Sequence, residues 1–213
     1  MTLSDQSEVQ RHPRAQGARH ARKFGADANA RLTSSTALVL LVLLAVEGVT
    51  VIQVRSLLTL HVFIGMLLVP PVLIKLASTF WRFAKYYSGS PDYRRKGPPP
   101  VVLRILGPMV AMLTIILFLS GILLMFCPKS WQLELLLLHK ASFILWFGCM
   151  TVHVLGHAGE TARLSTKDWV RRVRGQVAGS RARRLLISSS LISGLVLAFL
   201  TVPYVGPWLG ARG

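Results

Sequence analysis

The sequence has few acidic residues and few cysteines, and both shortages exclude classes of protein. Only 8 of its 213 residues are Asp or Glu, against 25 Lys and Arg, and charged residues make up 15% of a chain that is 52% hydrophobic. A soluble domain of this length is normally more polar, so the composition predicts an integral membrane protein. Cys127 lies at the end of an apolar segment and Cys149 inside another, which suits neither a disulfide framework nor a zinc site.

Motifs of several catalytic domains are also missing. The sequence contains no Walker loop, no dinucleotide-binding glycine fingerprint and no cysteine set for an iron–sulfur cluster. A redox role would therefore be that of one relay between partners and not of a self-sufficient reductase. The formal charge of +17 is gathered between apolar segments, a pattern that predicts membrane topology and no nucleic-acid binding.

Five apolar stretches approach the roughly 20 residues that a helix needs to cross a bilayer core of about 30 Å. The predicted spans are Thr36–Val54, Ser56–Phe80, Ile105–Phe126, Leu133–Leu155 and Leu185–Leu209. The first is preceded by a long polar arm and followed by no small-residue cleavage site, so we expect it to stay as a helix. The predicted fold class is all-α: an integral membrane bundle of five transmembrane helices, with a four-helix core and one additional helix.

Lys and Arg are distributed unevenly around these spans. Six precede the first span, six lie between the second and third, and eight lie between the fourth and fifth; Arg55, Lys129 and Arg212 are the three on the other side. Cytoplasmic segments carry the excess of Lys and Arg, so we expect a multi-pass protein of the cell inner membrane with a cytoplasmic N-terminus. The predicted divisions are a basic disordered arm (1–35), the four-helix core (36–157), a basic cytoplasmic loop (158–184), and a fifth helix with an outer C-terminus (185–213).

Four of the six histidines lie at or within the predicted spans, where ionisable side chains are costly unless they face a protein interior. His61 lies about five residues into the second span and His139 about six into the fourth. Both spans run inward from the outer surface, so the two imidazoles are expected at the same depth, where they can hold a haem iron between them. Gly65 follows His61 by one helical turn and would leave room for the macrocycle.

The fourth span carries further histidines on the same face. His139 and His153 are separated by about 40° around the helix and about 21 Å along it, and His157 returns close to the direction of His139. Such a stripe is expected when one helix serves two stacked redox centres. The alternative is that each histidine forms a hydrogen bond to a neighbouring helix, and for His157, at the inner boundary, that it faces water.

The sequence LHVFIG in the second span, the segment Lys75–Phe83 and the sequence HKASFILWFGCMTVH in the fourth span resemble one known family. It is the group of bacterial b-type cytochromes that contains cytochrome b561 and the hydrogenase cytochromes, and the resemblance covers roughly 38–157. The resemblance implies that His61 and His139 bind an outer haem b and that His153 binds an inner one. In that group the first helix supplies the second inner ligand, but here LTSSTALVLLVLLAVEGVTVIQV contains no histidine.

Three explanations of the missing inner ligand stay open. The inner haem is absent, it is held by His153 or His157 with an unusual partner, or a second polypeptide supplies the ligand. Lys75 lies fourteen residues after His61 on the same face. Its amine would contact a haem propionate or, once deprotonated, bind iron, unless it extends to the inner headgroups. One haem b is therefore expected, and a second is left open.

Three more charged residues lie near the outer haem level. Arg55 and Lys140 would meet propionates or else extend to the outer interface. Glu47, inside the first span, would carry protons at a quinone pocket or bond to a neighbouring helix.

Proline and tryptophan mark other features of the spans. Pro70 and Pro71 are predicted to bend the second span. Trp81, Trp131 and Trp208 fall near span ends and are interpreted as interfacial anchors.

The sequence thus predicts a haem b-containing cytochrome subunit in the lipid bilayer, in transmembrane electron transfer between a quinone and a partner redox protein, without a complete catalytic site of its own. A first alternative is a haem-free membrane anchor or assembly subunit with structural histidines. A second is a transition-metal transporter or sensor, although intramembrane acidic ligands are nearly lacking.

Overall fold

The structure is a computed structural model of the whole chain, and it describes residues 3–94, 101–169, 180–206 and 208. Side chains are described for 26–94, 101–102, 104–156, 180–206 and 208. All regular elements in these residues are helices, with no strand among them, in agreement with the predicted all-α class.

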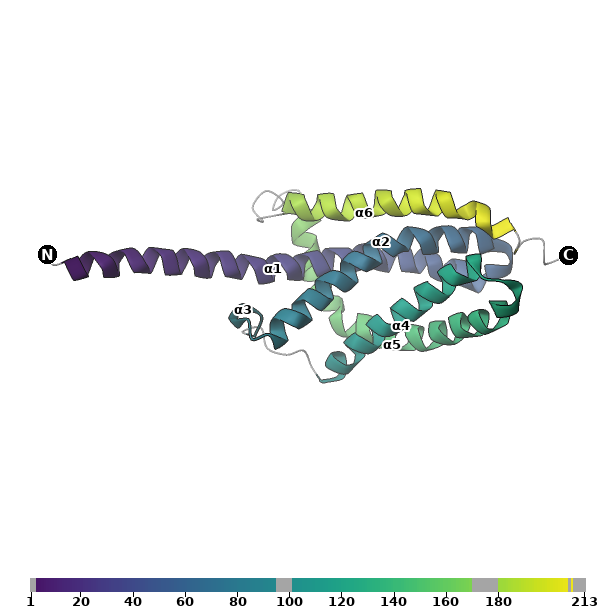
Figure 1. The fold of residues 1–213 in the computed structure, drawn as a ribbon, viewed down its shortest axis with the longest axis horizontal. Coiled ribbons are helices and arrows are strands. Elements are labelled where there is room, and N and C mark those ends of the chain that lie inside the picture. The colour runs from purple at the N-terminus through teal and green to yellow at the C-terminus, as the bar shows by residue number, and fades with distance from the viewer. Residues whose placement is uncertain (1–2, 95–100, 170–179, 207, 209–213) are drawn as a thin grey trace.

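The helices follow the order of the predicted spans, with three short additions (Figure 1). The long helices are α1 (Leu3–Ile52), α2 (Val54–Tyr87), α4 (Val101–Phe126), α5 (Gln132–Trp169) and α6 (Ser180–Thr201), and the short ones are α3 (Pro91–Arg94), η1 (Lys129–Trp131) and η3 (Val202–Val205). Each long helix contains a stretch long and apolar enough to cross a membrane, so the five predicted spans are confirmed. Large apolar side chains such as Val42, Ile144 and Phe199 are more than half exposed, as expected where lipid covers a bundle.

Helix α1 packs against the bundle from a point closer to the N-terminus than hydropathy predicts. Ala26 and Ala30, which precede the predicted start of the span at Thr36, are already buried. The basic arm, expected to be disordered, is helical from Leu3, since its Ala, Arg, Gln and Glu residues are good helix formers. In Figure 1 this part of α1 extends beyond the other helices.

Helix α2 departs from helical geometry near its beginning and not at its prolines. The helix continues through Pro70 and Pro71, while Leu57 has φ −110° and ψ 24°. Leu57 is one turn before His61, so this irregular turn sets the direction from which the His61 segment enters the bundle.

Helix α2 packs against α1 on one side and α6 on another, with Leu40, Ile64, Leu68 and Val72 as the buried core. The α2–α6 contact is close at Gly194, where a Cβ would overlap the carbonyl oxygen of Leu67. Only glycine permits two backbones to approach in this way.

Helices α4 and α5 form a second pair, joined through η1 (Figure 1). Within this pair, Trp146 donates from Nε1 to the hydroxyl of Thr114 at 2.9 Å, and both residues are buried. Helix α5 also contacts α1, whereas α2 and α4 touch only briefly. The weak α2–α4 contact leaves space between the two groups of helices, and the candidate site lies there.

Candidate functional site

The structure brings His61 of α2 and His139 of α5 together. The centres of their rings are 6.3 Å apart, and the ring planes make an angle of 76°. Both side chains are partly buried. Two histidines that are far apart in the sequence therefore meet between α2 and α5.

The His61 ring is held by α1. Its Nδ1 lies 2.9 Å from Oε1 of Glu47 and 3.2 Å from the hydroxyl of Thr50. Glu47 and Thr50 are one turn apart, so both face α2 across the tight connection at Gln53. Glu47 was predicted either to carry protons at a quinone pocket or to bond to a neighbouring helix. In the structure its carboxylate contacts His61 of the neighbouring helix α2.

The His139 ring is held by α4. Its Nδ1 lies 3.1 Å from the carbonyl oxygen of Leu117 and 3.1 Å from the hydroxyl of Ser120. Gly121 makes room for the ring, since a Cβ there would lie 3.0 Å from Cε1 of His139. A larger residue at this position would displace the imidazole.

These partners determine where each ring carries its proton. A carbonyl oxygen and a carboxylate only accept hydrogen bonds, so Nδ1 is the protonated nitrogen in both His61 and His139. In the neutral form of each ring, Nε2 then carries the lone pair. This is the usual arrangement of metal-binding histidines, whose other nitrogen donates to a carboxylate or a backbone carbonyl.

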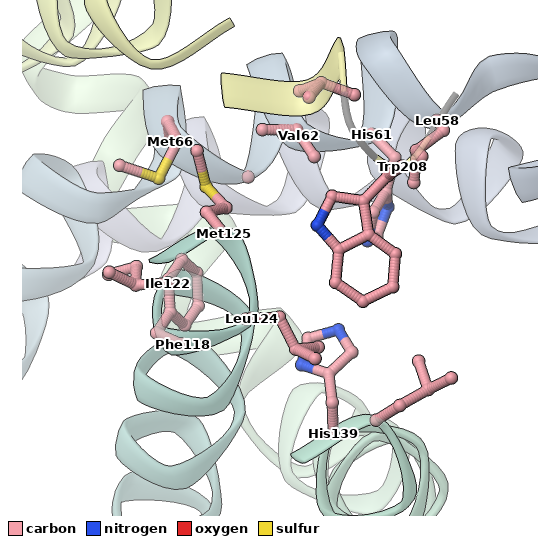
Figure 2. A pocket seen from close by; sticks show the side chains of 14 residues that line it. Leu58, His61, Val62, Met66, Phe118, Ile122, Leu124, Met125, His139 and Trp208 are labelled. Carbon is pink, nitrogen blue, oxygen red and sulfur yellow. The ribbon is translucent and has the colours of Figure 1, made fainter. Parts of the chain in front are cut away.

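Apolar side chains of several helices surround the two rings in a cavity of about 140 Å³. In Figure 2 the His139 ring extends from α5 into this cavity, while Trp208 and His61 lie across from it and Met66 and Met125 form another part of the wall. Trp208 was interpreted as an interfacial anchor, but its side chain lines the cavity. The segment that follows α6, with Val205 of η3 and Trp208, thus contributes to the site.

The spacing of the rings fits a metal shared between them. Imidazole nitrogens bind transition metals at about 2.0–2.1 Å, and each nitrogen lies about 1.1 Å from its ring centre, so two axial imidazoles have centres about 6.2–6.4 Å apart. The observed separation of 6.3 Å lies within this range. A common axis leaves the ring planes free to rotate, so their angle of 76° is compatible with such a pair.

The cavity is small for a ligand of the size of a porphyrin. Pockets that enclose drug-sized molecules measure roughly 300–1,000 Å³, so about 140 Å³ requires wall side chains to turn aside for a porphyrin. Met66 and Met125 have flexible thioether chains that repack at low cost. The two imidazole donors and the separation of their rings fit a haem iron, while the cavity as it stands is smaller than a porphyrin.

The remaining predicted residues lie in different surroundings. Gly65 lines the cavity, and a Cβ there would be 3.7 Å from Oε1 of Glu47. Arg55 and Lys140 are exposed and do not line the cavity. The amine of Lys75 donates to the carbonyl oxygen of Thr33 at 3.0 Å and so joins α2 to α1.

The described residues of α5 that follow His139 do not line this cavity. His153 is partly buried on α5 and is not among the residues that line it. The side chain of His157 is not among those that the structure describes. Its predicted role therefore stays a prediction. A second haem site stays a prediction.

Sequence reasoning missed the residues that orient the two rings. Thr50, Ser120 and Gly121 are small residues in apolar spans, and Thr50 follows Glu47 by three positions. Glu47 and Thr50 lie a few residues before the turn at Gln53, and His61 lies eight residues after it. Counting residues from this turn along both helices would have placed Glu47 and Thr50 near the depth of His61. The pairing of Ser120 with His139 needed the relative rotation of α4 and α5, which hydropathy does not provide.

The described residues contain no group of three or more His, Cys, Asp or Glu side chains that could hold a bare metal ion. Protein sites for bare zinc ions use three or four such ligands, whereas a haem iron needs only axial ones. No protein-family model, no curated protein and no solved structure matches the chain. The geometry at His61 and His139 is therefore the basis for a function.

Proposed function

We propose that this chain is a haem b-containing membrane cytochrome subunit in transmembrane electron transfer. The single observation that supports this most strongly is the pair His61 and His139, with ring centres 6.3 Å apart and Nδ1 of both rings engaged by other helices. Each ring is left with Nε2 as its ligating nitrogen. Two ligands prepared in this way on opposing helices are typical of a bis-histidine haem site.

The chain's own residues would bind the haem iron, orient the two imidazole rings and exclude water from the site. His61 and His139 would be the axial ligands, and bound haem would supply one-electron transfer. Thr50 and Ser120 limit the rotation of the rings through hydrogen bonds at 3.2 and 3.1 Å. The apolar wall keeps the surroundings at low dielectric, and axial ligands, burial and nearby charge are the properties through which a protein sets a haem's potential.

Topology and partners complete the proposal. The subunit lies in the cell inner membrane with its N-terminus in the cytoplasm, as the distribution of Lys and Arg predicts. Because the sequence carries no flavin or nicotinamide motif, the subunit would be one relay, which passes electrons between a quinone or a cytoplasmic donor and a partner redox protein. It has one haem at the His61–His139 site, with no complete catalytic site of its own.

A spectrum of the purified protein tests this proposal. Protein from haem-replete cells is expected to show Soret and alpha-band changes in a reduced-minus-oxidised spectrum. His61→Leu and His139→Leu should each abolish the spectrum, whereas His157→Leu, at the inner end of α5, should retain most of it. A colourless wild-type protein rejects the proposal.

The second candidate is a haem-free membrane anchor or assembly subunit. The observation that favours it is the small cavity, about 140 Å³, together with hydrogen bonds that already satisfy one nitrogen of each ring. It predicts a colourless protein that tolerates His139→Leu and loses only a co-purifying partner when the bundle is disturbed.

A further inference from the structure

The two rings at the site have partners of different charge. Nδ1 of His61 lies 2.9 Å from a carboxylate oxygen of Glu47. Nδ1 of His139 lies 3.1 Å from the carbonyl of Leu117 and 3.1 Å from the hydroxyl of Ser120, which are both neutral. The site therefore has one imidazole next to a carboxylate and one without.

The carboxyl group of Glu47 is itself held in place. Oε1 faces Nδ1 of His61, and Oε2 lies 2.9 Å from the hydroxyl of Thr50, which is also 2.7 Å from the Glu47 carbonyl oxygen. Both carboxyl oxygens thus lie within hydrogen-bond distance of a partner, Nδ1 of His61 for Oε1 and the hydroxyl of Thr50 for Oε2. The Glu47 side chain is 13% exposed and Thr50 is 1% exposed, so water screens this arrangement little.

Helix α2 provides the space for this carboxylate. A Cβ at Gly65 would lie 3.7 Å from Oε1 of Glu47, which is an ordinary contact distance. Gly65 was predicted to make room for the macrocycle. Gly65 also lies next to the Glu47 carboxylate, one helical turn after His61.

We propose that Glu47 is a positioning residue for His61: it selects the tautomer that presents Nε2, and its charge lowers the reduction potential of the iron between His61 and His139. The inference rests on the proposed haem site. A carboxylate on the far nitrogen raises the basicity of an imidazole ligand. A nearby negative charge also favours the oxidised iron, which has one more positive charge than the reduced iron, and burial strengthens this effect.

Redox titration of the purified holoprotein tests the role of Glu47. Glu47→Gln retains the size of the side chain and removes its charge, so its midpoint potential is expected to shift upward while the bis-histidine spectrum is retained. Glu47→Asp retains the charge, and its potential should stay closer to that of the wild type. The matched control is Glu134→Gln, which removes an exposed carboxylate in the first turn of α5, five residues before His139, and should leave the potential unchanged.

Each outcome of this experiment supports or overturns the inference. A wild-type protein without haem defeats the proposed function first, before the variants are compared. If the wild type binds haem, equal potentials for Glu47→Gln and the wild type overturn the role of Glu47, as does an equal upward shift in Glu134→Gln. Loss of haem from Glu47→Gln with retention in Glu47→Asp supports the positioning role, whereas loss from both overturns it.

Discussion

Replacing Gly121 by alanine is expected to displace the His139 ring. The added methyl carbon would lie 3.0 Å from Cε1 and 3.4 Å from Nδ1 of His139. Carbon atoms in contact rest at about 3.5–4.0 Å, so the ring must move by about half an ångström or more, or α4 and α5 must separate. Nδ1 is held at 3.1 Å by both Leu117 and Ser120, so the same movement weakens two hydrogen bonds.

The expected cost follows from these contacts. Overpacking a filled interior costs about 1–3 kcal/mol, and a weakened hydrogen bond about 0.5–1.5 kcal/mol. The control is Gly148→Ala on α5, where an added methyl group meets nothing within 4 Å. That variant should be neutral or gain up to about 1 kcal/mol, because alanine favours the helix more than glycine does.

Unfolding in detergent, followed by circular dichroism, compares the two variants, and the haem content of each is measured on the same samples. Gly121→Ala should unfold more easily than Gly148→Ala by at least about 1 kcal/mol and should bind less haem. Equal unfolding midpoints would refute the packing that we derive at His139. Lower stability with full haem content would show instead that the ring adjusts without losing its ligating position.

Two further predictions concern packing and topology. Gly194→Ala should destabilise the protein by about 1–3 kcal/mol relative to Gly148→Ala, since its methyl group would meet the backbone oxygen of Leu67, which cannot turn away; equal stability in detergent unfolding would contradict the close α2–α6 contact. A reporter enzyme that is active only outside the cytoplasm should be active when fused after Trp208 and inactive when fused to the N-terminus; the opposite pattern would reverse the predicted orientation.

The spans and the depth of the histidine pair could be predicted from the sequence, because both depend on length along a helix. A run of about 20 apolar residues fixes a span, and equal distance from the same membrane surface fixes a depth. His61 and His139 do lie together in the structure. The burial of Ala26 and Ala30, ahead of the predicted span, was missed because small residues bury well without raising hydropathy strongly.

The orientation of the rings could not be predicted, because it depends on how the helices are rotated about their axes. The sequence alone does not reveal that Ser120 and Gly121 face His139, or that Glu47 faces His61, since each helix can rotate relative to its neighbour without changing any depth. Side-chain contacts between neighbouring helices fix that rotation. The haem, its potential and the partners stay predictions, because they depend on the chemistry of a bound group.

The walls of the cavity come from α2 and from the segment after α6, which are far apart in the chain, and this has a consequence for biogenesis. Val205 and Trp208 line the same space as Leu58 and His61. During synthesis the earlier helices reach the bilayer long before this final wall has been translated. Cofactor delivery is therefore expected to be post-translational, and a ribosome stalled after α5 should yield a chain that has both ligating histidines but retains porphyrin poorly.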